Sequence, residues 1–253
     1  MKVKRKLADM GHVCILIRSY HPHINTSGAG LATLYDCLEQ FEYENWSSYV
    51  FYVDNTPVYD FGRVIEARDE KFRDKHHVVD TPYHYKWECD GDCGYAATDW
   101  AIYNICPKET RWLLLTNGDN DYTPDFLSFL DTDYDAIGFN WYTRETNIGN
   151  YVPQPDNINQ TYCDREWKMG CMKNRWRPRG YDMGTAIWNY PRFIKELKSY
   201  SKFSPTCCHD GYLAEDCVFT SGWKARDMPD CLFSHNPNPW SSCMRAKNPR
   251  LQT

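Results

Sequence analysis

The stretch Leu113-Leu-Leu-Thr-Asn-Gly-Asp-Asn-Asp-Tyr-Thr-Pro-Asp-Phe-Leu127 decides how the rest of the chain can fold. It begins with an apolar run, passes through a turn containing Asp119 and Asp121, and continues from Pro124 into a second apolar run. The first run is typical of a strand buried on both faces, and proline is favoured in the first turn of a helix. The pattern therefore indicates a strand, an acidic turn and a helix that starts at Pro124.

Similar units surround this stretch in the first 140 residues. Short apolar runs that are typical of buried strands occupy residues 13–17, 49–53, 78–79 and 135–140. Apolar side chains at helical spacing, or a proline-led apolar run, predict helices over residues 31–41, 94–105 and 124–130. Alternation of strands and helices predicts an α/β fold with a mostly parallel central sheet flanked by helices and a Rossmann-like nucleotide-binding half. Ligands of such sheets bind beyond the carboxyl ends of the strands.

The second half of the chain has a different pattern. Residues 141–180 are rich in Asn, Trp, Tyr, Arg and Pro and predict a long irregular insertion. A helix with Phe193 and Leu197 on one face follows, and another begins near Asp210 and continues to about Lys224. No repeat or low-complexity linker divides the chain, so a single domain over residues 12–253 is expected, with halves at 12–140 and 141–253.

Composition excludes several classes of protein. The chain has 253 residues, 40 of them aromatic, which excludes a disordered polymer. Its formal net charge of −5 gives no overall attraction to nucleic acid or to an anionic membrane. No stretch approaches the roughly 18 apolar residues that a membrane helix needs. The expectation is a globular domain that binds neither nucleic acid nor, through this chain, the interior of a membrane.

Twelve cysteines are many for this length and allow up to six disulfides. An oxidising compartment would suit them, and sequons at Asn25, Asn45 and Asn159 are compatible with it. The apolar run near the N-terminus is too short for a signal segment. The expected location is therefore the Golgi or secretory lumen if an anchor is missing from this chain, and the cytoplasm otherwise. A zinc site from His84, Cys89, Cys93 and Cys106 is a weaker interpretation, because structural zinc usually shows two close ligand pairs.

The acidic turn after residue 116 is the sharpest chemical signal. Asn117, Asp119 and Asp121 follow a buried strand at spacings of two residues. Hard oxygen ligands of this kind suit Mg²⁺ or Mn²⁺, which can hold a phosphorylated substrate by its oxygens. The alternative is a turn in which Asn, Asp and Gly satisfy only their own backbone. The position between a strand and a proline-led helix favours the metal site.

These residues resemble the metal-binding DxD region of GT-A glycosyltransferases, particularly the inverting family 2 type. Aligned on Pro124, the first Asp of that pattern falls on Asn117 and the second, which contacts the metal in that family, on Asp119. The first position therefore departs from the family. The resemblance implies a metal site at Asp119, with Asp121 and His235 as further ligands, and nucleotide contacts from Asn117 and Asp119.

Other segments follow the order of that family over roughly residues 12–236. The resemblance implies donor-binding side chains after the first two strands and in the helix at 94–105, namely Arg18, Asp54 and Asp99. It also implies an acceptor site built by the segment Gly180–Trp188 and by a Glu-Asp motif at residues 215–216. The acceptor residues would be Asp182, Trp188 and Glu215. The second acid of that motif, Asp216, is expected to be the general base.

The function implied by the resemblance is transfer of a sugar from a UDP- or GDP-sugar to a hydroxyl of a glycan or glycoconjugate. Mn²⁺ or Mg²⁺ would hold the diphosphate, Asp216 would accept the proton of the acceptor hydroxyl, and a single displacement would invert the anomeric centre. Aromatic faces such as Trp188, Trp141 and Tyr142 would stack on sugar rings.

Two interpretations from other classes remain open. An inactive sugar-binding or scaffold protein on the same fold would fit the loss of the first Asp at Asn117. A nucleotidyltransferase also uses paired carboxylates and Mg²⁺ on an α/β sheet. It would normally carry a glycine-rich basic loop after the first strand, where this chain has Arg18 and no nearby lysine.

Overall fold

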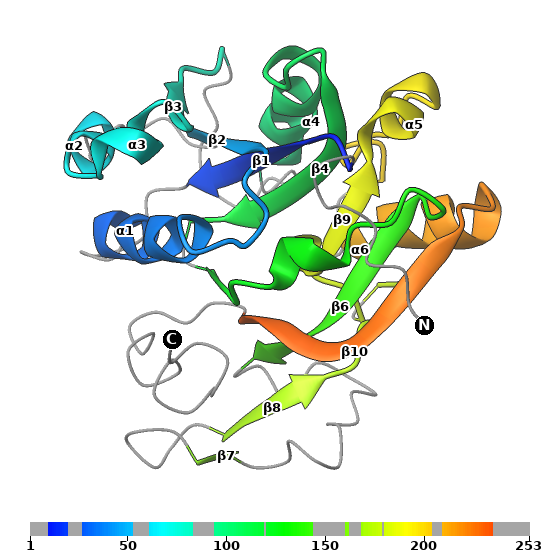
Figure 1. Cartoon of the computed structure of the whole chain (residues 1–253). Coiled ribbons are helices and arrows are strands. Elements are labelled where there is room, and N and C mark those ends of the chain that lie inside the picture. Colours follow the sequence, from blue (N-terminus) through cyan, green and yellow to red (C-terminus); the bar gives the residue numbers. More distant parts are fainter. Residues whose placement is uncertain are drawn as a thin grey trace.

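A computed structural model describes residues 10–19, 27–52, 61–82, 94–118, 120–143, 160–161, 168–178, 180–203 and 209–234 (Figure 1). The strands are β1 (His12–Ser19), β2 (Trp46–Tyr52), β3 (His76–Val79), β4 (Thr110–Asn117), β5 (Asp121–Tyr122), β6 (Ala136–Thr143), β7 (Gln160–Thr161), β8 (Lys168–Met172), β9 (Ala186–Asn189) and β10 (Ala225–Ser234). The α-helices are α1 (Ser27–Leu38), α2 (Phe61–Glu66), α3 (Glu70–Arg73), α4 (Tyr95–Asn104), α5 (Tyr190–Lys195) and α6 (His209–Glu215). Short 3₁₀ turns cover Phe126–Phe129 and Met183–Thr185, and a π-helical turn covers Asp216–Thr220.

One sheet organises the fold, with strand order β3-β2-β1-β4-β9-β6-β10-β5 and with β8 pairing with β6. Strands β3, β2, β1 and β4 are parallel, as the sequence predicted, and β6 and β10 are parallel to each other. Strand β9 lies antiparallel between β4 and β6, so β4 and β6 run in the same direction. The carboxyl ends of β1, β2, β4 and β6 therefore lie along one edge of the sheet, where a ligand of an α/β sheet binds.

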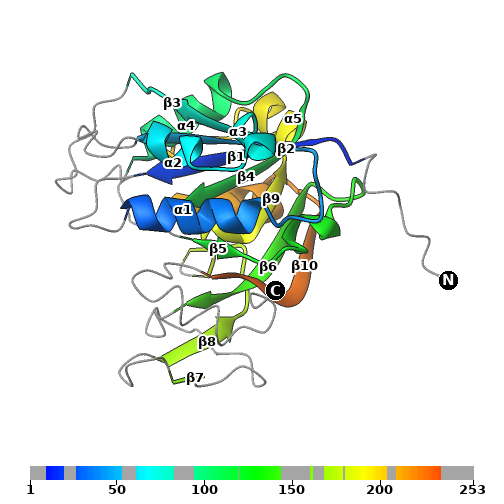
Figure 2. The ribbon, with the colours of Figure 1, turned by 60° about the vertical axis from the view of Figure 1, so that its left-hand side comes forward.

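The two faces of the sheet carry separate hydrophobic clusters because side chains alternate along a strand. In β1, Val13, Ile15 and Ile17 join the cluster under α1 and α2, whereas Cys14 and Leu16 join the cluster under α4, α5 and α6. Figure 2 shows α1 on one side of β1 and β4, with α4 and α5 on the other side. The predicted layer arrangement, an α/β sheet flanked by helices, is confirmed.

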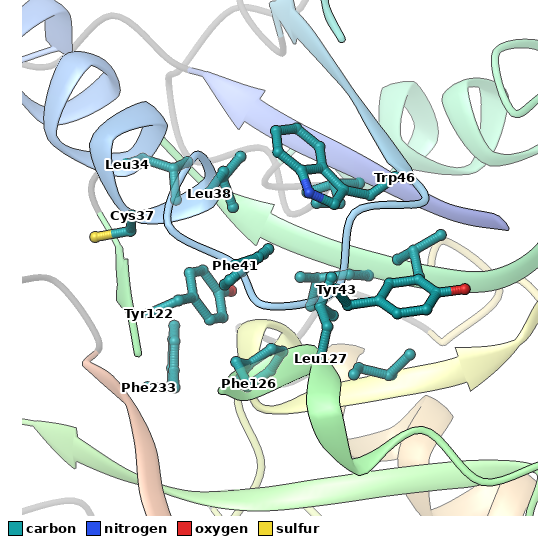
Figure 3. Close-up of a cluster of buried hydrophobic side chains, with 14 of the residues drawn as sticks. Leu34, Cys37, Leu38, Phe41, Tyr43, Trp46, Tyr122, Phe126, Leu127 and Phe233 are labelled. Atoms are coloured by element: carbon teal, nitrogen blue, oxygen red, sulfur yellow. The ribbon is translucent and has the colours of Figure 1, made fainter. Parts of the chain in front are cut away.

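The first cluster is rich in aromatic rings and supports the turn that follows β4. Figure 3 shows that α1, β5, the turn Phe126–Phe129 and β10 supply its side chains. The Phe126 ring lies 4.6 Å from that of Tyr122 and 6.3 Å from that of Phe41, between ring centroids. The segment predicted as a helix at 124–130 contains instead a 3₁₀ turn, and its Phe126 and Leu127 are buried in this cluster.

Three other segments differ from the sequence-based expectation. Strand β6 extends to Thr143 and pairs with β8, so the segment predicted as irregular at 141–180 contains two strands of the sheet. Helix α6 stops at Glu215 and passes into a π-helical turn, well before Lys224. Strand β10 was not predicted, because Pro229 interrupts its alternation at a point where the register against β6 shifts. Among the described residues, no helix has the length and apolar character required to cross a membrane.

Candidate active site

Arg18 joins three elements at the carboxyl edge of the sheet. It pairs in register with Asn117 of β4, and its carbonyl oxygen accepts a hydrogen bond of 3.0 Å from Gly118 N. The residue is only 7% exposed. The guanidinium lies 4.9 Å from the ring centroid of Tyr95, the first residue of α4, and its Nη1 lies 3.1 Å from Met183 Sδ. A cation is thus held where β1, α4 and the turn before β9 meet.

The buried hydroxyl of Thr116 supports the turn that follows β4. Thr116 Oγ1 accepts hydrogen bonds from Asn120 Nδ2 at 2.9 Å and from the Tyr122 hydroxyl at 2.7 Å. The side-chain oxygen Oδ1 of Asn117 is buried at the same edge and accepts no hydrogen bond within the described part of the chain. Asp119 lies outside the described residues. The hydrogen bonds to Thr116 therefore fix the start of the turn, and Asn117 Oδ1 is available there as an acceptor.

Asp121 is the second predicted metal ligand, and it is completely buried. Its Oδ1 accepts a 3.6 Å hydrogen bond from the thiol of Cys37 in α1. Asp121 pairs across β5 and β10 with Ser234, the residue directly before His235. His235 itself lies outside the described residues. The register of β5 and β10 brings the sequence neighbours of the predicted ligands Asp119 and His235 to the same corner of the sheet.

A divalent cation fits the chemistry of this corner. The Asn117 oxygen without a hydrogen-bond donor and the Asp121 carboxylate are hard oxygen ligands, which Mg²⁺ and Mn²⁺ prefer. Within the ranges that the structure describes, no group of three His, Cys, Asp or Glu side chains forms a complete metal site. A site here would need Asp119 or His235 in addition.

The predicted acceptor residue Asp182 shapes the turn that enters β9. Its Oδ1 accepts a 2.9 Å hydrogen bond from Gly184 N, and its carbonyl oxygen accepts one of 2.6 Å from Thr185 Oγ1. Gly184 has no room for a side chain, because a Cβ would lie 2.6 Å from Phe233 Cζ and 2.9 Å from the Tyr122 hydroxyl. Asp182 is thereby fixed beside Met183, which contacts Arg18.

A carboxylate that the sequence did not single out, Asp210, belongs to the same edge. It lies in the first turn of α6, and α6 precedes β10, a strand parallel to β6. A helix that returns the chain to the start of a parallel strand begins at the carboxyl edge. Gly211 fixes this start, since a Cβ there would lie 2.5 Å from Pro178 Cα.

Three buried tyrosines, Tyr95, Tyr181 and Tyr200, lie within the field of the Asp210 charge. Burial raises the pKa of Tyr95 well above its usual range, the Asp210 charge raises it further, and Arg18 opposes the shift. Burial, followed by the Asp210 charge, also raises the pKa of Tyr200. The charges of Asp210 and Asp182 act on the buried Tyr181 as well. The charges of Asp210, Asp182 and Arg18 thus all act on Tyr95, in a largely apolar, aromatic surrounding.

Asp216, the predicted general base, lies at the opposite end of this helical segment. Its Oδ2 is 2.6 Å from Nζ of Lys198, which is only 8% exposed and also contacts Ser221 Oγ. Although burial lowers the pKa of Lys198, its hydrogen bond to Asp216 raises it overall. The Ser221 carbonyl in turn accepts from Arg192, which pairs with Asp135 just before β6. Asp216 is thus placed near the amino end of β6, away from Arg18.

Asp99, predicted to contact the nucleotide, is occupied within the protein. Its two carboxylate oxygens accept hydrogen bonds of 2.6–2.9 Å from the backbone nitrogens of Tyr200 and Ser201 and the hydroxyls of Ser199 and Ser201. Helix α4 begins at the carboxyl edge, so its first residue, Tyr95, faces Arg18, whereas Asp99 lies one turn further along. The structure gives Asp99 a role in fixing the turn at 199–201.

The predicted sugar-stacking tryptophans are core residues. Trp188 is 0% exposed in β9 and packs against Trp176 and Trp223, and Trp141 is 4% exposed. Neither can present a ring face to a ligand in this arrangement. Glu215 is exposed at the end of α6, next to Asp216 and not beside Arg18. Asp54 and the side chain of Tyr142 lie outside the described part of the chain.

Comparison with solved structures identifies the class of fold. No protein-family model matches the sequence, and no curated protein matches it. The chain superimposes on the S. aureus protein TarS, residues 1–349, with a TM-score of 0.58 and 12% identity, covering 93% of this chain and 64% of that one. The fold is therefore that of GT-A glycosyltransferases, as the sequence resemblance implied.

Two further solved structures carry the same fold together with ligands. The mannosyltransferase PcManGT from Pyrobaculum calidifontis, in complex with GDP-Man and Mn²⁺, matches with a TM-score of 0.57 and 11% identity over 93% of this chain and 60% of its own. TarS 1–349 in complex with UDP-GlcNAc matches with a TM-score of 0.56 and 12% identity over 93% of this chain and 65% of its own. The chain spans somewhat less than two thirds of the length of these structures.

Proposed function

We propose that the chain is a glycosyltransferase that moves a sugar from a UDP- or GDP-sugar to an acceptor hydroxyl. The observation that carries the proposal is the gathering of Arg18, Asn117, Asp182 and Asp210 at the carboxyl edge of a GT-A fold. Proteins of the same fold are solved with UDP-GlcNAc and with GDP-Man and Mn²⁺. This edge is also the place where α/β sheets bind nucleotides.

The donor would bind at the ends of β1 and β4. Arg18 is a buried cation that can face an anionic diphosphate, and Asn117 Oδ1 can accept from a ribose hydroxyl or contact a cation. Asp119 is the principal proposed metal ligand, with Asp121 and His235 as further candidates. A bound Mn²⁺ or Mg²⁺ would compensate the negative charge that develops on the leaving diphosphate.

The acceptor hydroxyl would lose its proton to a carboxylate on the other side of Arg18. Asp210 suits this role better than Asp216, because it lies at the carboxyl edge, whereas Asp216 is the partner of the buried Lys198. The oxygen of the acceptor would attack the anomeric carbon opposite the diphosphate, so the proposed reaction inverts the anomeric configuration. Asp182 would hold the acceptor from the turn before β9.

A second candidate function is sugar-nucleotide binding without turnover. Asn117 favours it, because a neutral amide replaces the first carboxylate of the DxD pattern. Both candidates require donor binding, whereas only the first requires release of the sugar from its nucleotide.

Thermal shift with a panel of sugar nucleotides tests the proposal. We expect one UDP- or GDP-sugar to raise the melting temperature in the presence of Mn²⁺ and to do so less in EDTA. The variant Asp119→Ala should lose this Mn²⁺-dependent shift, while Glu66→Ala, which removes an exposed carboxylate from α2, should keep it. A panel in which no sugar nucleotide shifts the wild type would contradict both candidates, and binding without release of nucleotide would favour the second.

A further inference from the structure

The hydroxyl of Tyr122 lies between the acidic turn that follows β4 and the turn that enters β9. It is 2.7 Å from Thr116 Oγ1 and 3.2 Å from the carbonyl oxygen of Gly184. Thr116 is the last residue but one of β4, and Gly184 belongs to the 3₁₀ turn Met183–Thr185. One hydroxyl group therefore contacts two segments that are far apart in the sequence.

On the side of the acidic turn, Thr116 binds a residue on each side of Asp119. Thr116 Oγ1 accepts a hydrogen bond of 2.9 Å from Asn120 Nδ2 and donates one of 3.3 Å to the carbonyl oxygen of Asn117. The backbone nitrogen of Asn120 donates to the same carbonyl oxygen at 3.3 Å. Asp119, the principal proposed metal ligand, lies between Asn117 and Asn120 in the sequence. The Thr116 hydroxyl thus fixes both neighbours of that ligand.

On the other side, Gly184 connects Tyr122 to Asp182, the proposed acceptor residue. The Gly184 nitrogen donates a hydrogen bond of 2.9 Å to Asp182 Oδ1, and the Gly184 carbonyl oxygen faces the Tyr122 hydroxyl. A Cβ at Gly184 would lie only 2.9 Å from that hydroxyl, so this approach requires glycine. A continuous chain of hydrogen bonds therefore joins the neighbours of Asp119 to the Asp182 carboxylate.

The number of hydroxyl hydrogens makes the two ends of this chain depend on each other, because Tyr122 and Thr116 carry one each. When Tyr122 donates to Thr116, Thr116 can donate to the Asn117 carbonyl, and the Gly184 carbonyl receives no hydrogen from Tyr122. When Tyr122 donates to Gly184, Thr116 can donate to Tyr122, and the Asn117 carbonyl loses its hydrogen from Thr116. The two backbone carbonyls therefore compete through one pair of hydroxyl groups.

Burial makes this competition count. Thr116 is 0% exposed and Tyr122 is 1% exposed, so water does not readily replace a lost partner there. The Tyr122 ring is held by packing, with its centroid 4.6 Å from that of Phe126 and 5.1 Å from that of Phe233 (Figure 3). The substitution Tyr122→Phe should consequently remove the hydroxyl and leave the ring in place.

We propose that Tyr122 is a positioning residue that couples donor binding at the acidic turn to the order of the acceptor turn at residues 182–185. This role rests on the proposed function, since it assumes that a nucleotide diphosphate and a divalent cation bind beside Asn117 and Asp119. Their binding fixes one arrangement of the two hydroxyl hydrogens, and Gly184 and Asp182 are thereby ordered before the acceptor arrives. The donor should accordingly bind first.

Hydrogen–deuterium exchange and calorimetry test this coupling, with UDP and GDP as separate probes and Mn²⁺ in excess. In the wild type, the nucleotide that binds should slow exchange in peptides that cover residues 117–123 and also in peptides that cover 182–188. In Tyr122→Phe it should slow exchange only in the first segment. The dissociation constant of that nucleotide should rise by about 3–10-fold, the effect of one lost hydrogen bond.

Tyr43→Phe is the matched control, because it removes another tyrosine hydroxyl of the same hydrophobic cluster, one that donates to the Gly11 carbonyl. It should keep the nucleotide affinity and the protection of both segments. Thr116→Val should repeat the loss seen in Tyr122→Phe, and Thr116→Ser, which retains a hydroxyl, should restore the coupling.

Two results would overturn the proposal, and they are distinguishable. Protection of both segments in Tyr122→Phe to the extent seen in the wild type would remove the coupling role and leave the proposed function intact. Failure of both UDP and GDP to bind the wild type would contradict the proposed function and this role together.

Discussion

Two carboxylates six residues apart in one helical segment, Asp210 and Asp216, have different roles in the proposed mechanism. At a rise of 1.5 Å per residue they lie about 9 Å apart along the axis, so one cleft cannot use both equally. Asp210 is beside the edge where Arg18 lies, and Asp216 neutralises the buried Lys198. Both residues are aspartates, so their positions at opposite ends of this helical segment would decide which of them can act on a substrate.

Asp210→Asn should therefore lower turnover by about 10²–10⁴-fold, because the amide cannot accept the acceptor proton. Donor-dependent thermal shift and melting temperature should change little. Asp216→Asn should show the converse, with turnover kept and stability lowered by about 1–3 kcal/mol, because Lys198 loses a charged hydrogen-bond partner. Initial rates and urea denaturation of both variants measure the two effects.

Glu215→Gln is the matched control for these variants, since Glu215 is exposed and adjacent to Asp216. It should leave turnover and stability near the wild-type values. Loss of turnover in Asp216→Asn with full activity in Asp210→Asn would restore the sequence-based assignment of the base.

The sequence identified Arg18 and Asn117 correctly as residues at strand ends, because continuous apolar runs mark where strands stop. It did not single out Asp210, because the apolar flank of Glu215 and Asp216 suggested that Asp216 is a partly buried functional acid. That flank, with Leu213 and Cys217, packs into the core instead. A usable signal did exist: a helix that precedes a parallel strand starts at the site edge, so its first acid is the better candidate. That argument requires strand β10, which was not predicted because Pro229 interrupts its alternating pattern.

At the scale of elements, the end of α5 carries conformational strain. Leu197 has φ of 50°, and Leu197 N and Lys198 N donate to Ile194 O and Phe193 O at 3.1 Å. This is the Schellman pattern, in which glycine is the usual residue at the left-handed position. Leu197 is also 72% exposed, so its side chain buries little surface in return.

Leu197→Gly should consequently stabilise the protein by about 0.5–1 kcal/mol, or roughly 1–4 °C in melting temperature. Gly222 is the matched reverse case, with φ of 65° and open space where a Cβ would lie. Gly222→Ala should destabilise by about 1 kcal/mol for backbone reasons alone. Denaturant midpoints of the two variants measure these shifts, and equal signs for the two would contradict this explanation.

A buried polar network joins β2 and β3 to the segments that follow α1 and α2. His76 Nδ1 lies 2.7 Å from Ser48 Oγ, and its Nε2 lies 3.3 Å from Glu39 Oε1. Arg68 already binds both Glu39 oxygens at 2.7 Å, so the carboxylate charge is compensated. Burial, assisted by the Arg68 charge, therefore lowers the pKa of His76 to about 3.

This shift makes stability depend on pH in a defined window. The unfolded chain protonates His76 below about pH 6.5, whereas the folded chain does so only near pH 3, so stability is lost as the pH falls from 6.5. Between pH 7 and pH 5 the loss should be about 1–2 kcal/mol from this residue. Urea melts of His76→Asn should show a shallower pH dependence over that range. An unchanged slope would mean that His76 is not the titrating group.

At the scale of the whole molecule, the two halves of the chain meet at Gly184. Its missing side chain leaves space for Tyr122 of β5 and Phe233 of β10, two elements from different halves. Gly118 lies at the same edge, but a Cβ there would have its nearest contact at 3.7 Å, an ordinary distance. Gly184 is therefore needed for close packing, whereas Gly118 lies at the same edge without being needed for packing.

Gly184→Ala should destabilise the protein by about 1–3 kcal/mol, because the Phe233 ring must move to admit the methyl group. Gly118→Ala should change stability by less than about 0.5 kcal/mol. Thermal and urea unfolding of the two variants provide the measurement. A larger loss in Gly118→Ala than in Gly184→Ala would contradict the packing described here.

The fold class and the parallel strands of the first half followed from local patterns, because parallel strands buried on both faces leave continuous apolar runs. The second half could not be predicted equally well. Strand β9 is antiparallel between two parallel strands, and Trp188 is buried because β9 is central, which no local pattern reveals. Pairings such as β6 with β8 and β5 with β10 join segments distant in sequence, and only the folded chain shows them.

The pairing of β5 with β10 has a consequence for biosynthesis. Tyr122 pairs with Phe233, and Thr123 N donates to Leu232 O at 3.0 Å, across about 110 residues of chain. A ribosome delivers the N-terminal segments first, at about 5–20 residues per second. The corner next to the acidic turn thus lacks its last strand for several seconds after β1–β4 have emerged. The nascent chain should acquire the β1–β4 part of its sheet early, and the corner of the proposed ligand site only when residues 225–234 leave the exit tunnel.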